Sequence, residues 1–436
     1  MPLKPTAQTL LDALTPFGTD AHLALAVSGG GDSMGLLALA AQLQNTDTAP
    51  RFSVLTINHG LRAQAAEEAA QVAAMCKKLG LPHAILAADE RLGATDIQQQ
   101  ARNLRYRLMA QWCADNQAQG VVLAHHRDDQ AETILMRLAR GSGISGLGGM
   151  AAKQVLHTAQ GSLLLLRPFL ASAGVDLKDC AHQAGLPVID DPSNRDSQYE
   201  RVRWRQILPL LEAEGLGAER LAAMADEMRM VQAALDNKLA NWLDRHADWH
   251  DYGVLSVPRN DFDALPVPHK QRFIGRFAQY FGQHAHPIKQ KKTDRLLRHI
   301  DDTAHGASVL GGMHVRWRKA KLFLGREAAA CPTALMVPHT DVVYDRRYKL
   351  TASENAENLK LAALGSAGVA SMRARGVVFD DTVPTAYFAA LPGIFDGDNL
   401  LDCPLVPVPD ATLKPVKLGG IFHKSLYRDI LRGGQS

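Results

Sequence analysis

One short segment constrains the fold of this chain more than any other. It reads Ser28-Gly29-Gly30-Gly31-Asp32-Ser33 and directly follows the apolar run 22–27. Glycines let the backbone turn tightly and approach an anion closely. If a helix begins at Asp32, its free N–H groups and positive end face the same turn, and the two serines add hydroxyl donors. The segment therefore predicts a strand, a phosphate-binding loop and a helix.

The loop differs from the two commonest phosphate-binding motifs. No GK[ST] follows it, as a Walker A motif would require, and Met34 stands where a dinucleotide GxGxxG motif has its last glycine. The alternative is that the segment is an ordinary strand–helix turn that contains glycines and binds no phosphate.

Apolar runs typical of strands alternate with helical patterns through the first half of the chain. Strands are expected at 22–28, 52–59, 82–87, 121–125 and 163–169, and helices at 32–42, 66–79, 96–116 and 128–140. This repetition predicts an α/β fold with a parallel sheet covered by helices, where ligands bind at the carboxyl ends of the strands. The glycine loop, Asn58-His59 and His125-His126 all fall at such ends, which predicts a single site.

A chain of 436 residues is too long for one ordinary core. We expect an α/β catalytic domain at 1–207, a mostly helical domain at 208–330 and a small α+β domain at 331–436. A hairpin or strand is expected at 315–324.

Charge and cysteine usage exclude several classes of protein. The net charge is only +3, so any basic surface must be local. Residues 267–300 supply one, with Lys289, Lys291 and Lys292 close together. The five cysteines form no CxxC pair, which argues against a disulfide framework or a zinc ribbon and favours reduced thiols. Neither a signal peptide nor a run of about 18 apolar residues is evident, so we expect a cytoplasmic protein.

Acidic residues and histidines follow the strand expected at 121–125. Asp129 and Glu132 stand three apart, so their carboxylates could converge on Mg²⁺ or on an ammonium group; Asp128 with Glu132 is the alternative pair. Acidic side chains also suit the first turn of any helix. His125 lies beside them and is a candidate proton acceptor.

Two groups of arginines complete the candidate site. Arg102 and Arg105 lie three apart on an expected helix and share a face, from which either could clamp phosphate. Arg201, Arg203 and Arg205 follow an acidic segment and could contact a nucleic-acid backbone or an activated nucleotide. Solvated helix charges are the alternative for both groups.

The sequence SGGxDS after a first strand resembles the PP-loop of the N-type ATP pyrophosphatases, which cleave ATP between its α- and β-phosphates. Further segments resemble the tRNA(Ile)-lysidine synthetases, in that family's order: 58–62, 101–106, 124–133, 140–147, 167–168 and 191–196. The family usually has an Arg-Asn pair where this chain has Arg201-Val202.

This resemblance implies an ATP-dependent ligase that joins L-lysine to the 2-carbon of the wobble cytidine, position 34, of the CAU-anticodon tRNA(Ile). An adenylated tRNA forms with release of diphosphate, lysine then displaces AMP, and the codon read changes from AUG to AUA. The resemblance further implies ATP bound by Ser28, Gly29, Gly30, Gly31, Asp32 and Ser33, and Mg²⁺ at Asp32. From this resemblance together with the residue patterns above, we expect Asp32, Arg105, His125, Asp129, Glu132 and Arg205 to be catalytic, and Arg102, Arg201, Lys289, Lys291 and Lys292 to contact the tRNA.

Several alternatives remain open from the sequence alone. A tRNA thiolation enzyme would share the ATP chemistry, although such enzymes usually need CxxC cysteines. NAD or GMP synthetase, and an inactive tRNA-binding protein, are the others. A carboxylate or His125 could deprotonate lysine. The expected partners are tRNA(Ile), L-lysine and ATP, without a membrane; a homodimer is one open oligomeric state.

Overall fold

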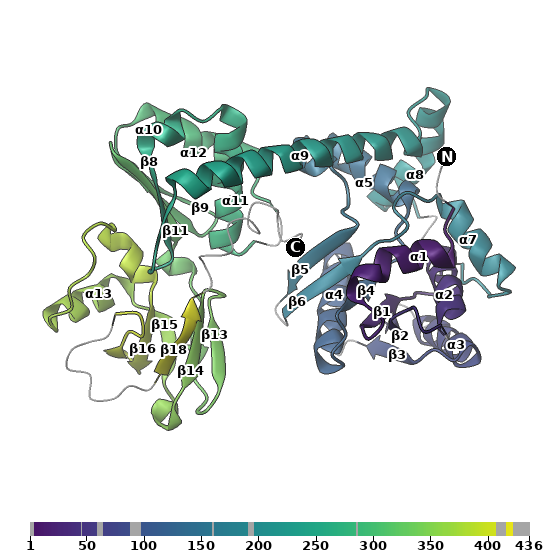
Figure 1. The fold of residues 1–436 in the computed structure, drawn as a ribbon, viewed down its shortest axis with the longest axis horizontal. Coiled ribbons are helices and arrows are strands. Elements are labelled where there is room, and N and C mark those ends of the chain that lie inside the picture. Colours follow the sequence, from purple (N-terminus) through teal and green to yellow (C-terminus); the bar gives the residue numbers. More distant parts are fainter. Residues whose placement is uncertain are drawn as a thin grey trace. The chain divides into compact units, whose positions relative to one another are not determined.

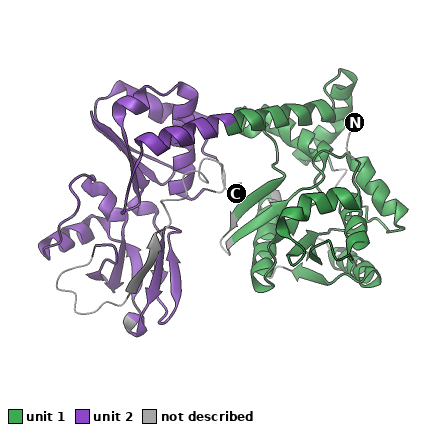
Figure 2. Ribbon diagram, in the orientation of Figure 1, with its two compact units in different colours: residues 1–233, 434–436 green, residues 234–433 purple. Residues whose placement is uncertain are grey.

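The computed structural model describes residues 4–44, 46–58, 64–87, 97–158, 161–190, 196–284, 287–406 and 416–421. The chain divides into two compact units, one of residues 1–233 with 434–436 and one of residues 234–433 (Figure 2). The boundary between them falls inside helix α9 (Ala218–His246). The three-domain borders expected from the sequence stay predictions.

Unit 1 contains a six-stranded sheet with the order β3-β2-β1-β4-β6-β5 (Figure 1). Its strands are β1 (His22–Ala26), β2 (Arg51–Asn58), β3 (His83–Ala87), β4 (Gly120–Val122), β5 (Lys153–Thr158) and β6 (Gly161–Leu166). All neighbours pair in parallel except β5, which is antiparallel to β6. The chain runs outward from β1 to β3 and then crosses to β4. The carboxyl ends of β1 and β4 therefore meet at a topological switch point, where such sheets bind ligands.

The helices of this unit are α1 (Ala7–Leu14), α2 (Gly31–Leu43), α3 (Gln64–Leu79), α4 (Ile97–Asp115), α5 (Arg127–Ala139), α6 (Ile144–Leu147), α7 (Gly174–Gln183) and α8 (Glu200–Ala213). Helices α1, α2, α3 and α7 pack on one face of the sheet and α4 on the other. Because strand side chains alternate between faces, Leu23 and Leu25 join one core while Ala24 joins the other, which includes Tyr106 of α4. The parallel α/β fold class predicted from the sequence is confirmed; the antiparallel strand β5 was not predicted.

Helix α2, which follows the glycine loop, packs closely against α7. A Cβ atom at Gly35 would collide with the carbonyl oxygen of Leu177. The absence of a side chain at Gly35 thus allows the two helix backbones to touch, which fixes the position of the α2 N-terminus at the sheet edge.

Unit 2 begins with an antiparallel sheet of order β7-β8-β11-β10-β9. Its strands are β7 (Asp248–His250), β8 (Val254–Pro258), β9 (Gly306–Leu310), β10 (Met313–Trp317) and β11 (Lys321–Arg326), and it packs with α10 (Arg259–Asp263), α11 (Val267–Gly282) and α12 (Gln290–Asp302). The hairpin predicted at 315–324 is confirmed by the pairing of β10 with β11. The region expected to be mostly helical thus also contains a sheet, whose short strands gave little periodic signal.

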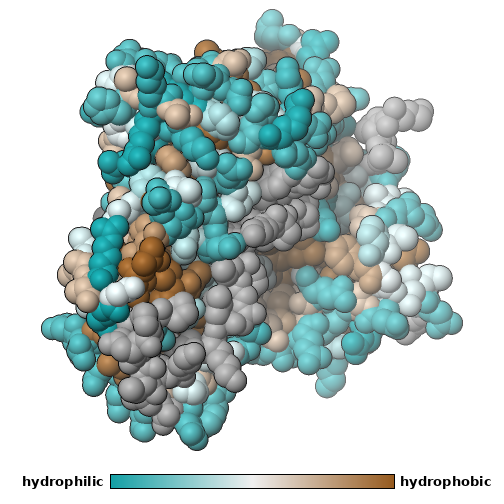
Figure 3. Space-filling view, turned by 60° about the vertical axis from the view of Figure 1, so that its left-hand side comes forward, coloured by the Kyte–Doolittle hydropathy of each residue, from teal (hydrophilic) through white to brown (hydrophobic). Residues whose placement is uncertain are grey.

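The C-terminal part of unit 2 is α+β, as predicted. It contains β12 (Ala334–Leu335), β13 (Asp341–Tyr344), β14 (Tyr348–Ala352), β15 (Lys360–Ala363), α13 (Gly365–Ala374), β16 (Pro392–Asp396), β17 (Asn399–Asp402) and β18 (Val416–Ile421). The face shown in Figure 3 is largely hydrophilic. In the part of the chain that the structure describes, no helix is both long and apolar enough to cross a membrane.

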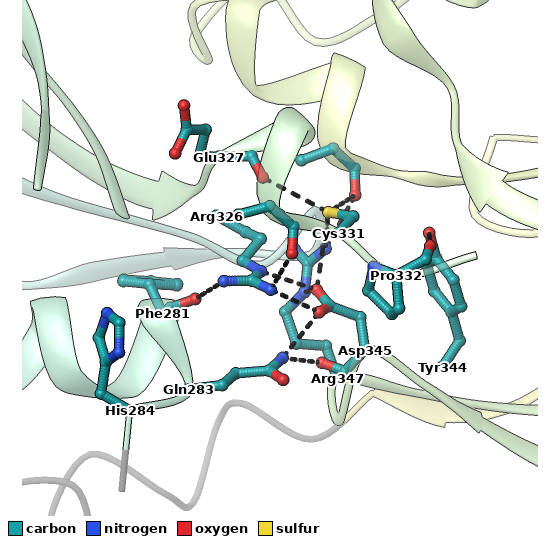
Figure 4. Close-up of polar contacts among 12 residues, drawn as sticks. Phe281, Gln283, His284, Arg326, Glu327, Cys331, Pro332, Tyr344, Asp345 and Arg347 are labelled. Atoms are coloured by element: carbon teal, nitrogen blue, oxygen red, sulfur yellow. Dashed lines mark hydrogen bonds and ion pairs between the residues drawn. The ribbon is translucent and has the colours of Figure 1, made fainter. Parts of the chain in front are cut away.

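A buried ion-pair network joins the two parts of unit 2 at Asp345 (Figure 4). The fully buried Asp345 carboxylate accepts hydrogen bonds from Arg326 of β11 at 3.0 and 3.2 Å and from Arg347 at 2.7 Å. Gln283, at the end of α11, donates to the Asp345 side chain at 2.7 Å. Asp345 and Arg346 have left-handed φ angles of 47° and 51°, a strain that the surrounding network offsets.

Candidate active site

The glycine loop connects the end of β1 to the start of α2 and is shaped by its own serines. The Ser33 hydroxyl donates to the Gly30 carbonyl at 2.9 Å and accepts the Ser28 N–H at 3.1 Å. Gly29 has a φ of +90°, and a Cβ there would lie 2.5 Å from Ile189 Cδ1. No side chain caps α2 at Gly30. Its first N–H groups therefore point toward the turn, as an anion site needs.

Asp32, in the first turn of α2, faces His126, the N-cap of α5. Asp32 Oδ2 lies 3.5 Å from His126 Nε2, which is also 3.4 Å from Asp129 Oδ2. Burial alone would raise the pKa of Asp32, but contact with His126 and the charges of Lys178 and Arg205 lower it. Burial would lower the pKa of His126, but the surrounding carboxylates raise it. An ionised carboxylate thus sits beside the loop, and its buried Oδ1 atom has no hydrogen-bond partner among the described residues.

Asp129 and Glu132 lie on α5, as the sequence predicted, and arginines from α8 bind both. Arg201 donates to Glu132 Oε2 at 2.5 Å and to Asp129 Oδ1 at 3.1 Å, while Arg205 donates to Glu132 Oε1 at 2.7 Å. Glu132 is only 1% exposed. A buried carboxylate requires such compensation. Asp128 faces elsewhere and accepts the Gly174 N–H at 2.9 Å, so Asp129 rather than Asp128 is the neighbour of Glu132 in this cluster.

His125, three residues after β4, is held by Arg167. Arg167 Nε donates to His125 Nδ1 at 3.2 Å. Burial, together with the charges of Arg167 and Arg201, keeps the pKa of His125 well below its usual value. The ring is therefore neutral near pH 7. Since Nδ1 accepts a hydrogen bond, the single proton resides on Nε2, and the ring offers an N–H donor rather than a lone pair.

The remaining predicted residues lie in two places. Arg102 and Arg105 are exposed on α4, and the Arg102 guanidinium lies 5.0 Å from the centre of the Tyr106 ring. Lys289, Lys291 and Lys292 belong to unit 2, where they are exposed at the start of α12. His59 and the segment 191–195 lie outside the described residues.

Sequence reasoning gave no role to Lys178 or Arg167. Lys178 projects from α7 and packs against the glycine loop. A Cβ atom on Gly31 would lie 2.8 Å from Cγ of Lys178. Its charge helps to lower the pKa of Asp32. Nothing in the helical pattern of α7 distinguished Lys178 from its neighbours. Arg167 does belong to the motif Arg167-Pro168, but the sequence did not show that it binds His125.

This chain is similar to known proteins over much of its length. Residues 3–211 match the PP-loop domain family. The tRNA(Ile)-lysidine synthase of Ruegeria pomeroyi is 35% identical over 415 residues, which cover 94% of each chain. That of Methylobacterium nodulans is 44% identical over 64% of this chain and 81% of its own. A solved structure, the U34-tRNA thiolase NcsA from Methanococcus maripaludis, covers 51% of this chain and 77% of its own at 14% identity, with a TM-score of 0.43.

These similarities differ in strength. The likeness to the thiolase is too weak to carry an argument. In contrast, the 35% identity extends along nearly the whole length of both chains, and the loop, the histidines and the acidic pair stand together at the switch point of the sheet. This chain belongs to the tRNA(Ile)-lysidine synthase family.

Proposed function

We propose that this chain is an ATP-dependent ligase that joins L-lysine to the wobble cytidine of the CAU-anticodon tRNA(Ile). The single observation that carries the proposal is the junction at His126. Through this residue the glycine loop with Asp32 adjoins the acidic cluster of Asp129 and Glu132. An anion-binding loop and a candidate ammonium site thus share one wall, as a reaction between an adenylated nucleotide and an amine requires.

The glycine loop serves the adenylation half of the reaction. Attack of the cytidine 2-oxygen on the α-phosphate transfers AMP to the tRNA and leaves negative charge on diphosphate. N–H groups at the start of α2 and the hydroxyl of Ser28 stabilise that charge, while Ser33 holds the shape of the loop. Asp32 is suited to hold Mg²⁺, since its buried Oδ1 has no protein partner among the described residues. Bound there, the ion would neutralise phosphate charge.

The acidic cluster serves the lysine half. Asp129 and Glu132 attract the ammonium group, and Arg201 and Arg205 hold both carboxylates in position. The lysine must lose a proton before it displaces AMP, and a carboxylate is the better acceptor because His125 offers an N–H. His125 is placed to donate to an oxygen of the adenylate instead.

The exposed lysines of α12 are proposed to contact the tRNA backbone. Replacing Lys289, Lys291 and Lys292 with alanine should weaken tRNA binding and reduce its dependence on salt, whereas replacing the exposed Lys77 and Lys78 of α3 should not. An unchanged salt dependence in the α12 variant would remove this surface from the proposal. We place the reaction in the cytoplasm, and a homodimer stays a prediction that sedimentation can test.

The decisive experiment combines the protein with ATP, radiolabelled lysine and transcripts of tRNA(Ile). Label should enter the tRNA only when ATP is present and position 34 is cytidine; a transcript with uridine at this position is the matched control. Diphosphate release without lysine in the tRNA would contradict the proposal and favour a different acceptor for the adenylate.

A further inference from the structure

A short segment, residues 148–151, contacts two residues that adjoin the candidate lysine site. They are Gln130, next to Asp129, and Arg167, which binds His125. The side chain of Gln130, which stands next to Asp129, binds Met150 twice: Met150 N–H donates to its Oε1 at 2.6 Å, and its Nε2 donates to the Met150 carbonyl at 2.8 Å. Arg167 donates to the Ala151 carbonyl at 2.8 Å and also holds His125. A displacement of this segment would therefore act on α5 and on His125 together.

Helix α9 holds the other side of the same segment. Arg229 donates to the carbonyl oxygens of Gly148 and Met150 at 2.6 and 3.4 Å. One turn further, Gln232 packs against Gly148 and donates to the carbonyl of Ile144, four residues before the segment, at 2.7 Å. The Met150 carbonyl also accepts from Gln130 and the Ile144 carbonyl from the Gly148 N–H, so α9 supplies part of the donors that hold this stretch of backbone.

The glycines make this contact close. A Cβ at Gly149 would lie 2.6 Å from Gln130 Oε1, and a Cβ at Gly148 would lie 2.8 Å from Gln232 Nε2. At these two glycines the backbone of the segment thus lies directly against the side chains of α5 and α9.

We propose that Arg229 and Gln232 are positioning residues for lysine binding, which act on Asp129 and His125 through the backbone of residues 148–151. Neither residue touches the reacting groups. Both stand in the last turns of α9 before residue 233, beyond which the same helix continues into unit 2. The helix that continues from unit 1 into unit 2 therefore also sets the geometry of the amine site. This inference rests on the proposed function, because it assumes that lysine binds at Asp129 and Glu132.

The test compares Arg229→Met, Arg229→Lys and Gln232→Ala with two controls on α9. Met230→Ala changes a side chain that is 65% exposed, and Asp226→Asn removes the ion-pair partner of Arg229 while leaving its donors to Gly148. Steady-state kinetics give the KM for lysine and the KM for ATP. Hydrogen exchange of the Met150 amide reports on the segment without any turnover.

In Arg229→Met we expect the KM for lysine to rise about five- to tenfold, with the KM for ATP within about twofold. Arg229→Lys, which keeps a donor, should recover most of the loss, and Met150 should exchange faster only in Arg229→Met and Gln232→Ala. An unchanged KM for lysine in folded variants would overturn the proposal, as would equal rises for lysine and ATP. If Arg229→Met does not fold, the KM for lysine and the Met150 exchange rate of Gln232→Ala test the proposal in its place.

Failure of the proposed function would look different. In that case the wild-type protein would incorporate no lysine, and fast exchange at Met150 in the variants would still show that α9 holds the segment. Normal exchange at Met150 in both variants would reject the positioning role whatever the reaction proves to be.

Discussion

The Nε atom of Arg201 lies 2.5 Å from Oε2 of Glu132, a carboxylate that is almost entirely buried. Arg205 binds the other oxygen of the same carboxylate. Two cations from α8 thus enclose an anion of α5, and Arg201 also pairs with the neighbouring Asp129. An incoming ammonium would join a network that already fixes the carboxylates, so little reorganisation is needed when lysine binds.

Glu132→Gln removes the anion that both arginines share. We expect the free energy of unfolding to fall by about 1–3 kcal/mol, less than for a wholly buried pair because both arginines are partly exposed. Lysine incorporation should fall at least about tenfold. Urea titration and the labelling assay measure the two effects, with Glu219→Gln on α9, a 75% exposed side chain, as the control. Wild-type lysine incorporation in Glu132→Gln would exclude this carboxylate from the site.

The contact of His126 with its carboxylates should make stability depend on pH. The folded pKa of His126 is raised, so its contribution is fully present below about pH 6.5 and is lost as the pH rises through the folded pKa. Each unit of the shift contributes about 1.4 kcal/mol. Unfolding free energies between about pH 5.5 and 9 should decline more steeply for the wild type than for His126→Asn. His182→Asn, at an exposed histidine, should behave like the wild type; equal slopes for wild type and His126→Asn would contradict the shift.

His125 should act as a hydrogen-bond donor. Asparagine keeps an N–H donor but cannot serve as a base at neutral pH, so His125→Asn should retain about tenfold more lysine transfer than His125→Ala. Because the pKa of His125 lies well below 6.5, its titration should not appear in the rate profile near neutrality. If both variants lose activity equally and a neutral-range inflection disappears, His125 is the base after all.

Two glycine-to-alanine changes should have opposite effects on stability. At Gly35 the added methyl group meets the backbone of Leu177, which cannot rotate away, and we expect a loss of about 1–3 kcal/mol. At Gly275, inside α11, the corresponding space is open, and better helix propensity should add about 0.5–1 kcal/mol. Denaturant midpoints of the two variants check both signs. A neutral Gly35→Ala would mean that α2 and α7 separate easily.

The sequence predicted the parts of the site that lie near one another along the chain. The loop and the histidines come directly after apolar strands, so the strand–helix repeat was enough to place them at the sheet edge. The pairing of Arg201 with Glu132 spans 69 residues, and nothing in either local pattern indicated it. The same is true of Arg167, whose hydrogen bond fixes the tautomer of His125 across 42 residues.

In the fold, the apolar strands of unit 1 were predicted, short as some of them are, whereas strands β7 and β9 of unit 2 were not. The strand β7 has three residues with a single apolar side chain, and β9 has five that begin with glycine and include a serine, so neither produced a clear period. They become strands because β8 and β10 supply hydrogen-bonding edges beside a buried core. Tertiary context, not local propensity, decides such segments.

The network at Asp345 has a practical consequence for building chimeras from related chains. A crossover near Cys331 would separate Arg326 and Gln283 from the carboxylate they bind, and two sequences that evolved apart would meet at a fully buried charge. Residues on both sides of Cys331 should therefore be exchanged as one block. Solvent-facing positions within α9, such as Met230, offer the better crossover, because their side chains are not buried.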